Sequence, residues 1–249
     1  MSDELVVTGI VLYTDLHNDY DKRLVVLTVE RGKITIFANG ARRQNSIYRA
    51  ACQSFVMGKF TVRPGRNSYN LIKAEVSDYF TEISQDMDKL CYASYFGELM
   101  SYYTREGDFC KNNLNLLYFT LKALVNKTVP ERLIRCIYEV KLMDIEGQAI
   151  HAFNCVKCGT KDDLMFFDAA HGGVLCMRCA MKYKITKQIS NTLLYTLQFI
   201  LSSPLNSLYT FNLENRYLKE LEDITDRFRR QYVDREFKSL DILESLKIN

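Results

Sequence analysis

The chain has 249 residues, of which 47% are hydrophobic and 25% are charged, and its formal net charge is +3. These fractions are typical of a soluble globular protein with a sizeable core, in one large domain or two modest ones. The first residues, MSDELVVTGIVLY, lack a basic segment followed by an unbroken apolar one, and no run of about eighteen apolar residues occurs anywhere. We therefore expect a cytoplasmic protein without a signal peptide or a membrane span.

Short segments rich in Val, Ile, Leu and Thr occupy the first eighty residues, and they predict β-strands. These segments are 4–16, 24–30, 33–39, 53–63 and 68–76. Gly9 predicts a bend or bulge in the first strand. The second and third segments flank Arg31-Gly32, and the last two flank a turn at 64–67, so each pair predicts a hairpin. Five short strands favour an OB-type barrel over residues 1–80, a fold whose strand face and loops can bind single-stranded nucleic acid.

From about residue 85 the apolar residues recur at helical spacing. The predicted helices are 87–103, 114–125, 130–145, 187–201, 213–233 and 236–247, and Pro130 suits the first turn of the third. Between the two predicted hairpins, residues 39–52 are expected to form a helical turn or an irregular basic loop. We predict an α+β multidomain protein, with an OB barrel followed by a helical domain at 81–249 and a metal-binding module inserted at about 151–185.

Four cysteines define that inserted module. Cys155/Cys158 and Cys176/Cys179 form two C-x-x-C pairs separated by seventeen residues. A turn can aim both thiolates of such a pair at one point, and the spacing lets the second pair complete a tetrahedron, so the pattern predicts one zinc ion. Four thiolates leave no open coordination position, which favours a structural zinc over a catalytic one. The alternative is that these cysteines are free or disulfide-paired.

Basic residues are concentrated in one segment of the first part. Between Arg31 and Ala74 there are nine Lys and Arg residues and no Asp or Glu. A segment of one charge sign inside a nearly balanced chain favours a positive face for a polyanion, although a solvated surface without acids is the alternative. Arg42 and Arg43 are the first candidates for phosphate contacts because polar neighbours place them in an exposed connection. The complete candidate set is Lys33, Arg42, Arg43, Arg49, Arg63 and Arg66.

The remaining residue patterns give little indication of a catalytic site. None of the three histidines stands in a recognisable nucleophile arrangement, and the phosphate-cradling and dinucleotide-binding glycine motifs are absent. A non-catalytic protein is therefore expected. Two alternatives to a DNA-binding function stay open: a zinc-ribbon adaptor that binds only proteins, and an OB-fold protein that binds RNA. The aromatic residues of the last helices are expected in the core, with a groove for a partner's peptide as the other reading.

In the order of its parts the chain resembles the bacterial RecO family of recombination mediators, which are DNA repair proteins. Three stretches carry this resemblance: TGIVLYTDLHNDYDKRLVVLTVERGKITIFANGARRQNS near the start, the module CVKC…GGVLCMRC, and FRRQYVDREFKSLDIL near the end. The resemblance implies an OB-fold joined to a helical domain. It implies binding of single- and double-stranded DNA and annealing of complementary strands.

The resemblance also implies partners and site residues. The partners would be RecR, the C-terminal tail of the single-stranded-DNA-binding protein and, indirectly, RecA, which the chain would help to load. Lys33, Arg42, Arg43 and Arg49 would contact DNA, and the four cysteines would be the metal ligands. The protein would act in the cytoplasm, associated with the nucleoid.

Overall fold

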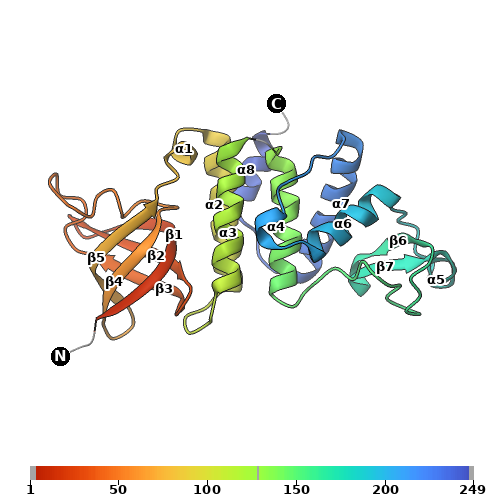
Figure 1. The fold of residues 1–249 in the computed structure, drawn as a ribbon, viewed down its shortest axis with the longest axis horizontal. Coiled ribbons are helices and arrows are strands. Elements are labelled where there is room, and N and C mark those ends of the chain that lie inside the picture. Colours follow the sequence, from red (N-terminus) through yellow and green to blue (C-terminus); the bar gives the residue numbers. More distant parts are fainter. Residues whose placement is uncertain (1–3, 128, 247–249) are drawn as a thin grey trace. The chain divides into compact units, whose positions relative to one another are not determined.

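A computed structural model of the chain describes residues 4–127 and 129–246, and these form two compact units (Figure 1). The first unit contains residues up to Val125 together with the C-terminal segment from Phe237. The second unit comprises Asn126–Glu236.

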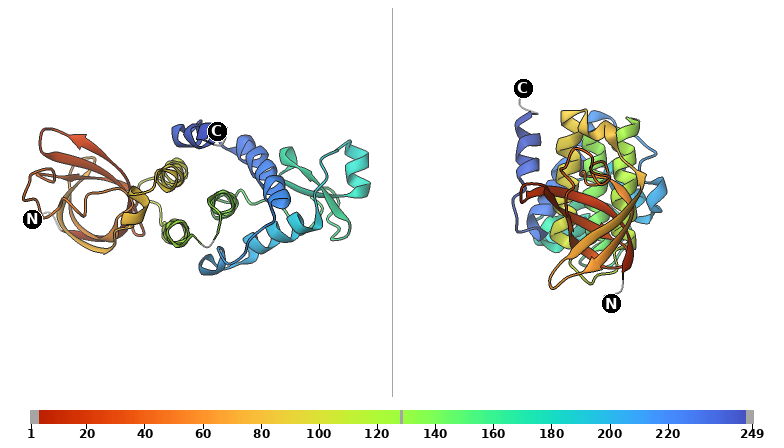
Figure 2. Two further views of the ribbon diagram at one scale, coloured as in Figure 1. Left: turned by 90° about the horizontal axis from the view of Figure 1, so that it is seen from above. Right: turned by 90° about the vertical axis from the view of Figure 1, so that its left-hand side faces the viewer.

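A closed five-stranded barrel forms the start of the first unit. Its strands are β1 (Leu5–His17), β2 (Asp21–Thr28), β3 (Gly32–Ala38), β4 (Met57–Pro64) and β5 (Tyr69–Asp78). They follow the order β1-β2-β3-β5-β4, in which only the β3–β5 pairing is parallel among the described strands. The right-hand view of Figure 2 shows these strands crossing one another around the barrel. The predicted OB-like barrel and both of its hairpins are confirmed.

Alternation along the strands separates an inner core from an outer face, as the period of two requires. The barrel interior is filled by buried residues that include Val11, Leu24, Ile36, Phe60 and Val62. Leu12 and Val25 point to the other side of their strands and are also buried, because α2 packs against β1. One part of the outer barrel surface is thus covered by a helix.

Two details of the barrel differ from the sequence prediction. The bulge in β1 falls between Val11 and Tyr13, and not at Gly9. Gly9 serves a different purpose, because a Cβ atom at this position would lie 2.6 Å from the carbonyl oxygen of Leu27. The fourth strand begins at Met57 and not at residue 53, since Phe55 has a left-handed backbone with φ of 70° and ends a series of turns.

Four helices complete the first unit. They are α1 (Thr81–Ser84), α2 (Met87–Tyr103), α3 (Lys111–Asn126) and the final helix α8 (Lys238–Leu246). The chain returns to this unit from far away in sequence, because α8 packs against α2. Ser239 donates a hydrogen bond of 2.7 Å to Glu98, and the rings of Phe237 and Tyr95 meet edge to face at 5.7 Å.

The second unit combines helices with a small two-stranded sheet. Its elements are α4 (Glu131–Ile145), β6 (Leu164–Asp168), a 3₁₀ turn at Ala169–His171, β7 (Gly173–Cys176), α5 (Met177–Tyr183), α6 (Asn191–Ser202), a second 3₁₀ turn at Leu205–Ser207, and α7 (Asn215–Tyr232). The module with the four cysteines lies between α4 and α6, as predicted. Pro130 is the N-cap residue of α4 and not part of its first turn. The next long helix begins at Asn191, where Ser190 caps it by accepting a hydrogen bond from the Leu193 amide.

A buried ionic cluster joins α4 to α7. Glu139 is 1% exposed and lies 3.9 Å from Arg135 and 4.0 Å from Arg229, measured between carboxylate oxygen and guanidinium nitrogen. Asp226 lies 3.3 Å from Arg135 as well. Buried charges need such partners because isolated ones would lose their hydration. Among the described residues, no helix is long and apolar enough to cross a membrane.

Candidate metal centre and nucleic-acid interface

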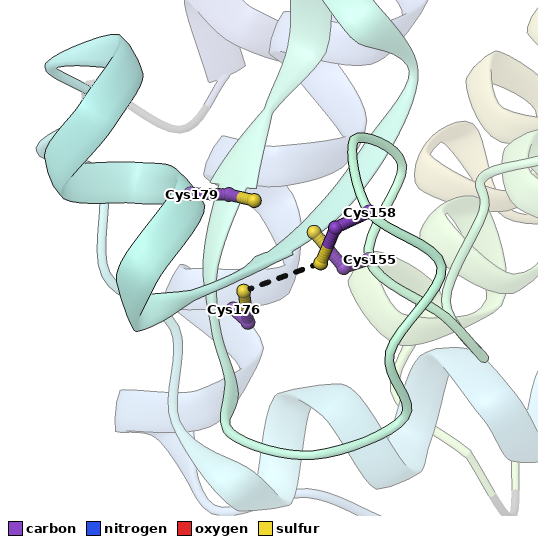
Figure 3. A group of neighbouring side chains, drawn as sticks. All are labelled: Cys155, Cys158, Cys176 and Cys179. Carbon is purple, nitrogen blue, oxygen red and sulfur yellow. Dashed lines mark hydrogen bonds between the residues drawn. The ribbon is translucent and has the colours of Figure 1, made fainter.

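The four cysteines of the module converge on one point (Figure 3). Their Sγ atoms all lie within 4.8 Å of one another, and those of Cys158 and Cys176 are 3.7 Å apart. A tetrahedral zinc ion with Zn–S bonds of about 2.3 Å requires S–S separations of about 3.8 Å. The donor set and its spacing therefore fit a four-coordinate metal ion, and the predicted cysteine cluster is confirmed.

Local backbone structure positions the two halves of this centre. Cys155 and Cys158 lie in a tight turn closed by the amide of Gly159, which donates to the Cys155 carbonyl at 2.8 Å. Cys176 ends strand β7, and Cys179 lies in the first turn of α5. The β6–β7 hairpin holds the second half against the first. Gly173 is required where this hairpin passes the chain at His151, because a Cβ atom there would lie 2.5 Å from the His151 carbonyl oxygen.

Electrostatics within the centre favour bound positive charge. Burial raises the pKa of Cys155, but backbone amides, first that of Cys176, outweigh this effect and lower it to about 6. Burial and the neighbouring thiols raise the pKa of Cys179 to about 12. Four thiolates so close together repel one another strongly, so that without a cation some must stay protonated. The protein offers four sulfur ligands, enough to fill a tetrahedral coordination shell.

The candidate nucleic-acid interface begins at the connection between β3 and β4. We call residues 39–52 the basic loop; it consists of successive turns, and no regular helix forms in it. The loop is attached to the β1–β2 turn at residues 18–20. Arg42 donates from its backbone to the Tyr20 carbonyl and from its side chain to that of Asp19, both at 2.9 Å. The amide of Gly40 donates to the Asp21 carboxylate at 2.7 Å.

These bonds hold two of the predicted arginines at the surface. Arg42 and Arg43 are both exposed. The guanidinium of Arg43 lies 5.5 Å from the ring centroid of Tyr20, which is itself 56% exposed. A guanidinium has five N–H donors, and Arg42 uses its Nη1 toward the carbonyls of Asp19 at 2.9 Å and Asn18 at 3.4 Å, so donors on its other nitrogens remain for a phosphate. Arg49 is exposed in the same loop.

The other predicted basic residues lie apart from the basic loop. Arg63 is half-exposed and pairs with Glu4 at 3.0 Å, and Arg66 is exposed in the turn between β4 and β5. Lys33 does not join either group. Its ammonium donates to the carbonyl and hydroxyl oxygens of Ser101 in the last turn of α2. Lys33 thus satisfies a helix C-terminus.

Sequence reasoning did not single out His17, Tyr20 and Arg23, which the fold brings to Phe37 or to the basic loop. The ring centroids of His17 and Phe37 are 4.6 Å apart, and Arg23 pairs with Phe37 in the β2–β3 register. Tyr20 could not be recognised from the sequence either, because a tyrosine in a turn gives no periodic signal. The segment 31–74 also contains aromatic residues that could stack on bases; of these, Phe55, Phe60 and Tyr69 are buried. Tyr48 and Phe37 are both partly buried. The Tyr48 hydroxyl donates to the Ile72 carbonyl, whereas the Phe37 ring lies beside the exposed His17, so Phe37 is the better candidate for stacking on a base.

Comparison with known proteins identifies the family. The family model described as Recombination protein O N terminal matches residues 1–80, and the model described as Recombination protein O C terminal matches residues 84–241. A protein named DNA repair protein RecO from Thermoanaerobacter sp. (strain X514) is 26% identical over 243 residues, which are 98% of each chain. The protein of that name from Halalkalibacterium halodurans is 30% identical over 96% of this chain and 94% of its own. The relative from Acetivibrio thermocellus is 27% identical over 97% of both chains. The chain therefore belongs to the RecO family of recombination proteins, which supports a role in DNA repair and recombination.

Proposed function

We propose that this protein is a non-catalytic recombination mediator that binds single- and double-stranded DNA and anneals complementary strands. It would also help to load RecA onto DNA coated by the single-stranded-DNA-binding protein, with RecR and the C-terminal tail of that coating protein as partners, at the nucleoid in the cytoplasm. The observation that supports this most strongly is the family match over residues 1–80 and 84–241. The exposed cations of the basic loop supply a physical means for it.

The proposed mechanism is electrostatic. Two DNA strands repel each other through their phosphates, and a surface with surplus positive charge lowers this repulsion by replacing the condensed counterions. Arg42 and Arg43 would contact phosphates, and Arg49, Arg63 and Arg66 would extend the positive surface. The tilted pair of His17 and Phe37 offers a place for one base to stack while neighbouring bases stay available for pairing. Lys33 would support the barrel through Ser101 and contribute little to phosphate contacts.

We propose zinc as the ion of the four-cysteine centre, with a structural role. The thiolate set and the 3.7 Å separation of two sulfur atoms support this choice. When bound, the ion would neutralise the thiolate charge and hold the β6–β7 hairpin against the Cys155–Cys158 turn. It would leave no position for water, so the protein's action on DNA would not use it chemically.

The test is the salt dependence of DNA binding, measured by fluorescence anisotropy with a labelled single strand. The variant Arg42→Ala/Arg43→Ala should lower the slope of log affinity against log salt by about 1.4, because each lost phosphate contact on a single strand removes about 0.7. Between about 50 and 200 mM salt this is a sevenfold smaller loss of affinity. Lys59→Ala/Lys73→Ala is the matched control, since these lysines lie opposite or beside Glu75 on β4 and β5.

The outcomes separate the alternatives. An unchanged slope in the arginine variant would remove both residues from the interface. No salt-dependent affinity for any nucleic acid in the folded wild-type protein would favour an adaptor that binds only proteins. Tighter binding of RNA than of DNA of the same sequence would favour an RNA-binding function, because only the 2′-hydroxyl distinguishes the two backbones.

A further inference from the structure

The second unit contains a polar cavity that the proposed function leaves unused. It has a volume of about 380 Å³ and lies where the chain leaves α5 and passes the C-terminal half of α7. Three basic side chains line it, those of Lys184, Lys187 and Arg227. Thr186 and Gln231 also line it and can donate hydrogen bonds. A concave site with several convergent donors is suited to an anion.

The charge in and around this cavity does not balance. Asp223 pairs with both Lys187, at 2.5 Å, and Arg227, at 2.8 Å. One carboxylate is therefore shared between two cations. The carboxylate of Asp168, which also lines the cavity, accepts hydrogen bonds from His171 and from the Ala170 amide. Three cations, Lys184, Lys187 and Arg227, thus stand against two carboxylates, those of Asp168 and Asp223. The positive charge exceeds the negative charge.

Helix α5, which ends directly before Lys184 of the cavity, also carries basic and aromatic residues. Arg178 and Lys182 are exposed on this helix, which has no acidic residue. Tyr183 is 45% exposed, and the ammonium groups of Lys157 and Lys182 lie 5.0 Å and 5.5 Å from its ring centroid. A ring that already attracts cations on its face can also accept a nucleobase by stacking. Cations next to an exposed ring are the combination that single-stranded nucleic acid uses.

We infer that this surface is a second DNA-binding site, in which Lys184, Lys187 and Arg227 receive a backbone phosphate and Tyr183 receives a base. The inference rests on the proposed function in taking DNA as the ligand. It adds that each of the two units binds a strand of its own. A protein with two strand sites raises the local concentration of one strand near the other, which is what annealing requires. An acidic peptide would meet the charge requirement as well, but every nucleobase can stack on the exposed ring, whereas a peptide needs a suitably placed apolar side chain to use it.

The test compares variants that remove charge inside and outside the cavity. Lys184→Gln/Arg227→Gln removes two cations of the lining. Arg216→Gln/Lys219→Gln removes the same charge from the first part of α7, outside the lining, and is the matched control. Both are measured on the full-length protein with metal bound, after thermal unfolding has shown that each variant is folded.

Two readouts are used, the number of single-stranded oligonucleotides of about eight nucleotides bound per chain and the annealing rate of longer complementary strands. We expect two bound oligonucleotides for the wild-type protein and the control, and one for the cavity variant. The cavity variant in the Arg42→Ala/Arg43→Ala background should lose most of the remaining salt-dependent binding. Its annealing rate should fall more than its affinity for one strand.

Three results would overturn the inference. The first is that the cavity variant binds as many oligonucleotides as the wild-type protein, with the same salt slope, while Arg42→Ala/Arg43→Ala still loses binding. This result would leave the proposed function intact. The second is a cavity variant that binds DNA normally but loses affinity for an acidic peptide. The third is a wild-type protein that binds no DNA at all, which would refute the proposed function together with this site.

Discussion

Replacement of Cys176 by Ser tests whether the four-cysteine centre stabilises the second unit through a metal ion. Cys176 is 5% exposed at the end of β7 and contributes one of four sulfur atoms within 4.8 Å. Two thiolates about 4 Å apart repel by about 4 kcal/mol at an effective dielectric constant of about 20. A bound cation offsets this repulsion, so a centre that loses its ion must take up protons. Without the ion, the centre also loses its metal cross-link between β7 and the Cys155–Cys158 turn.

We expect the Cys176→Ser protein to lose at least about 3 kcal/mol of unfolding free energy, the lower end of what breaking a buried ionic site costs. For a unit of this size the midpoint of thermal unfolding should fall by about 10 °C or more. The assay is calorimetry with and without a chelator, combined with elemental analysis for zinc. Cys110→Ser is the matched control, because Cys110 is 3% exposed and lies outside the cluster. A wild-type protein with no bound metal, or one whose unfolding a chelator leaves unchanged, would refute this reasoning.

Further predictions concern charge and packing. Glu139→Leu should cost about 1–3 kcal/mol in urea unfolding, because it removes the buried carboxylate that Arg135 and Arg229 share and leaves them Asp226, at 3.3 Å and 3.6 Å; an unchanged free energy of unfolding would show that the cluster relaxes or hydrates. The Gly40 amide and then Asn18 lower the pKa of Asp21, so its stabilisation is present above the unfolded pKa of about 3.9 and lost as the pH falls through the lower folded value. Asp21→Asn should therefore show less acid destabilisation than wild type in this window, by circular dichroism, and identical curves would contradict the assignment. Gly9→Ala should cost about 1–3 kcal/mol, since its Cβ would meet the Leu27 carbonyl at 2.6 Å; an unaffected melting temperature would show that β1 shifts freely.

Local patterns predicted most of the barrel and the metal ligands. Strand alternation and the turn at 64–67 depend on neighbouring residues, so they could be recognised without tertiary information. The same holds for the C-x-x-C pairs, whose geometry follows from one tight turn each. The predicted helix 87–103 agrees with α2 (Met87–Tyr103) because its signals are local: a long apolar segment without proline and the N-cap residue Asp86 directly before it.

Features that depend on distant contacts were not predictable. The contact of Lys33 with Ser101, sixty-eight positions later in the chain, arises only when the barrel and α2 come together. The bulge in β1 follows from its register with β2 and β4 and not from Gly9. Helix α8 follows α7 in the chain but packs on α2 through Phe237, a contact that no local pattern indicates. The pairing of Arg43 with Tyr20 joins two turns that only the fold brings together.

The measurement that tests the account most directly is the rate at which the purified protein anneals two complementary oligonucleotides coated with single-stranded-DNA-binding protein, over a series of salt concentrations. The account predicts an acceleration that declines as salt rises and that is reduced in the Arg42→Ala/Arg43→Ala variant. A folded, metal-loaded protein that gives no acceleration at any salt concentration would contradict it.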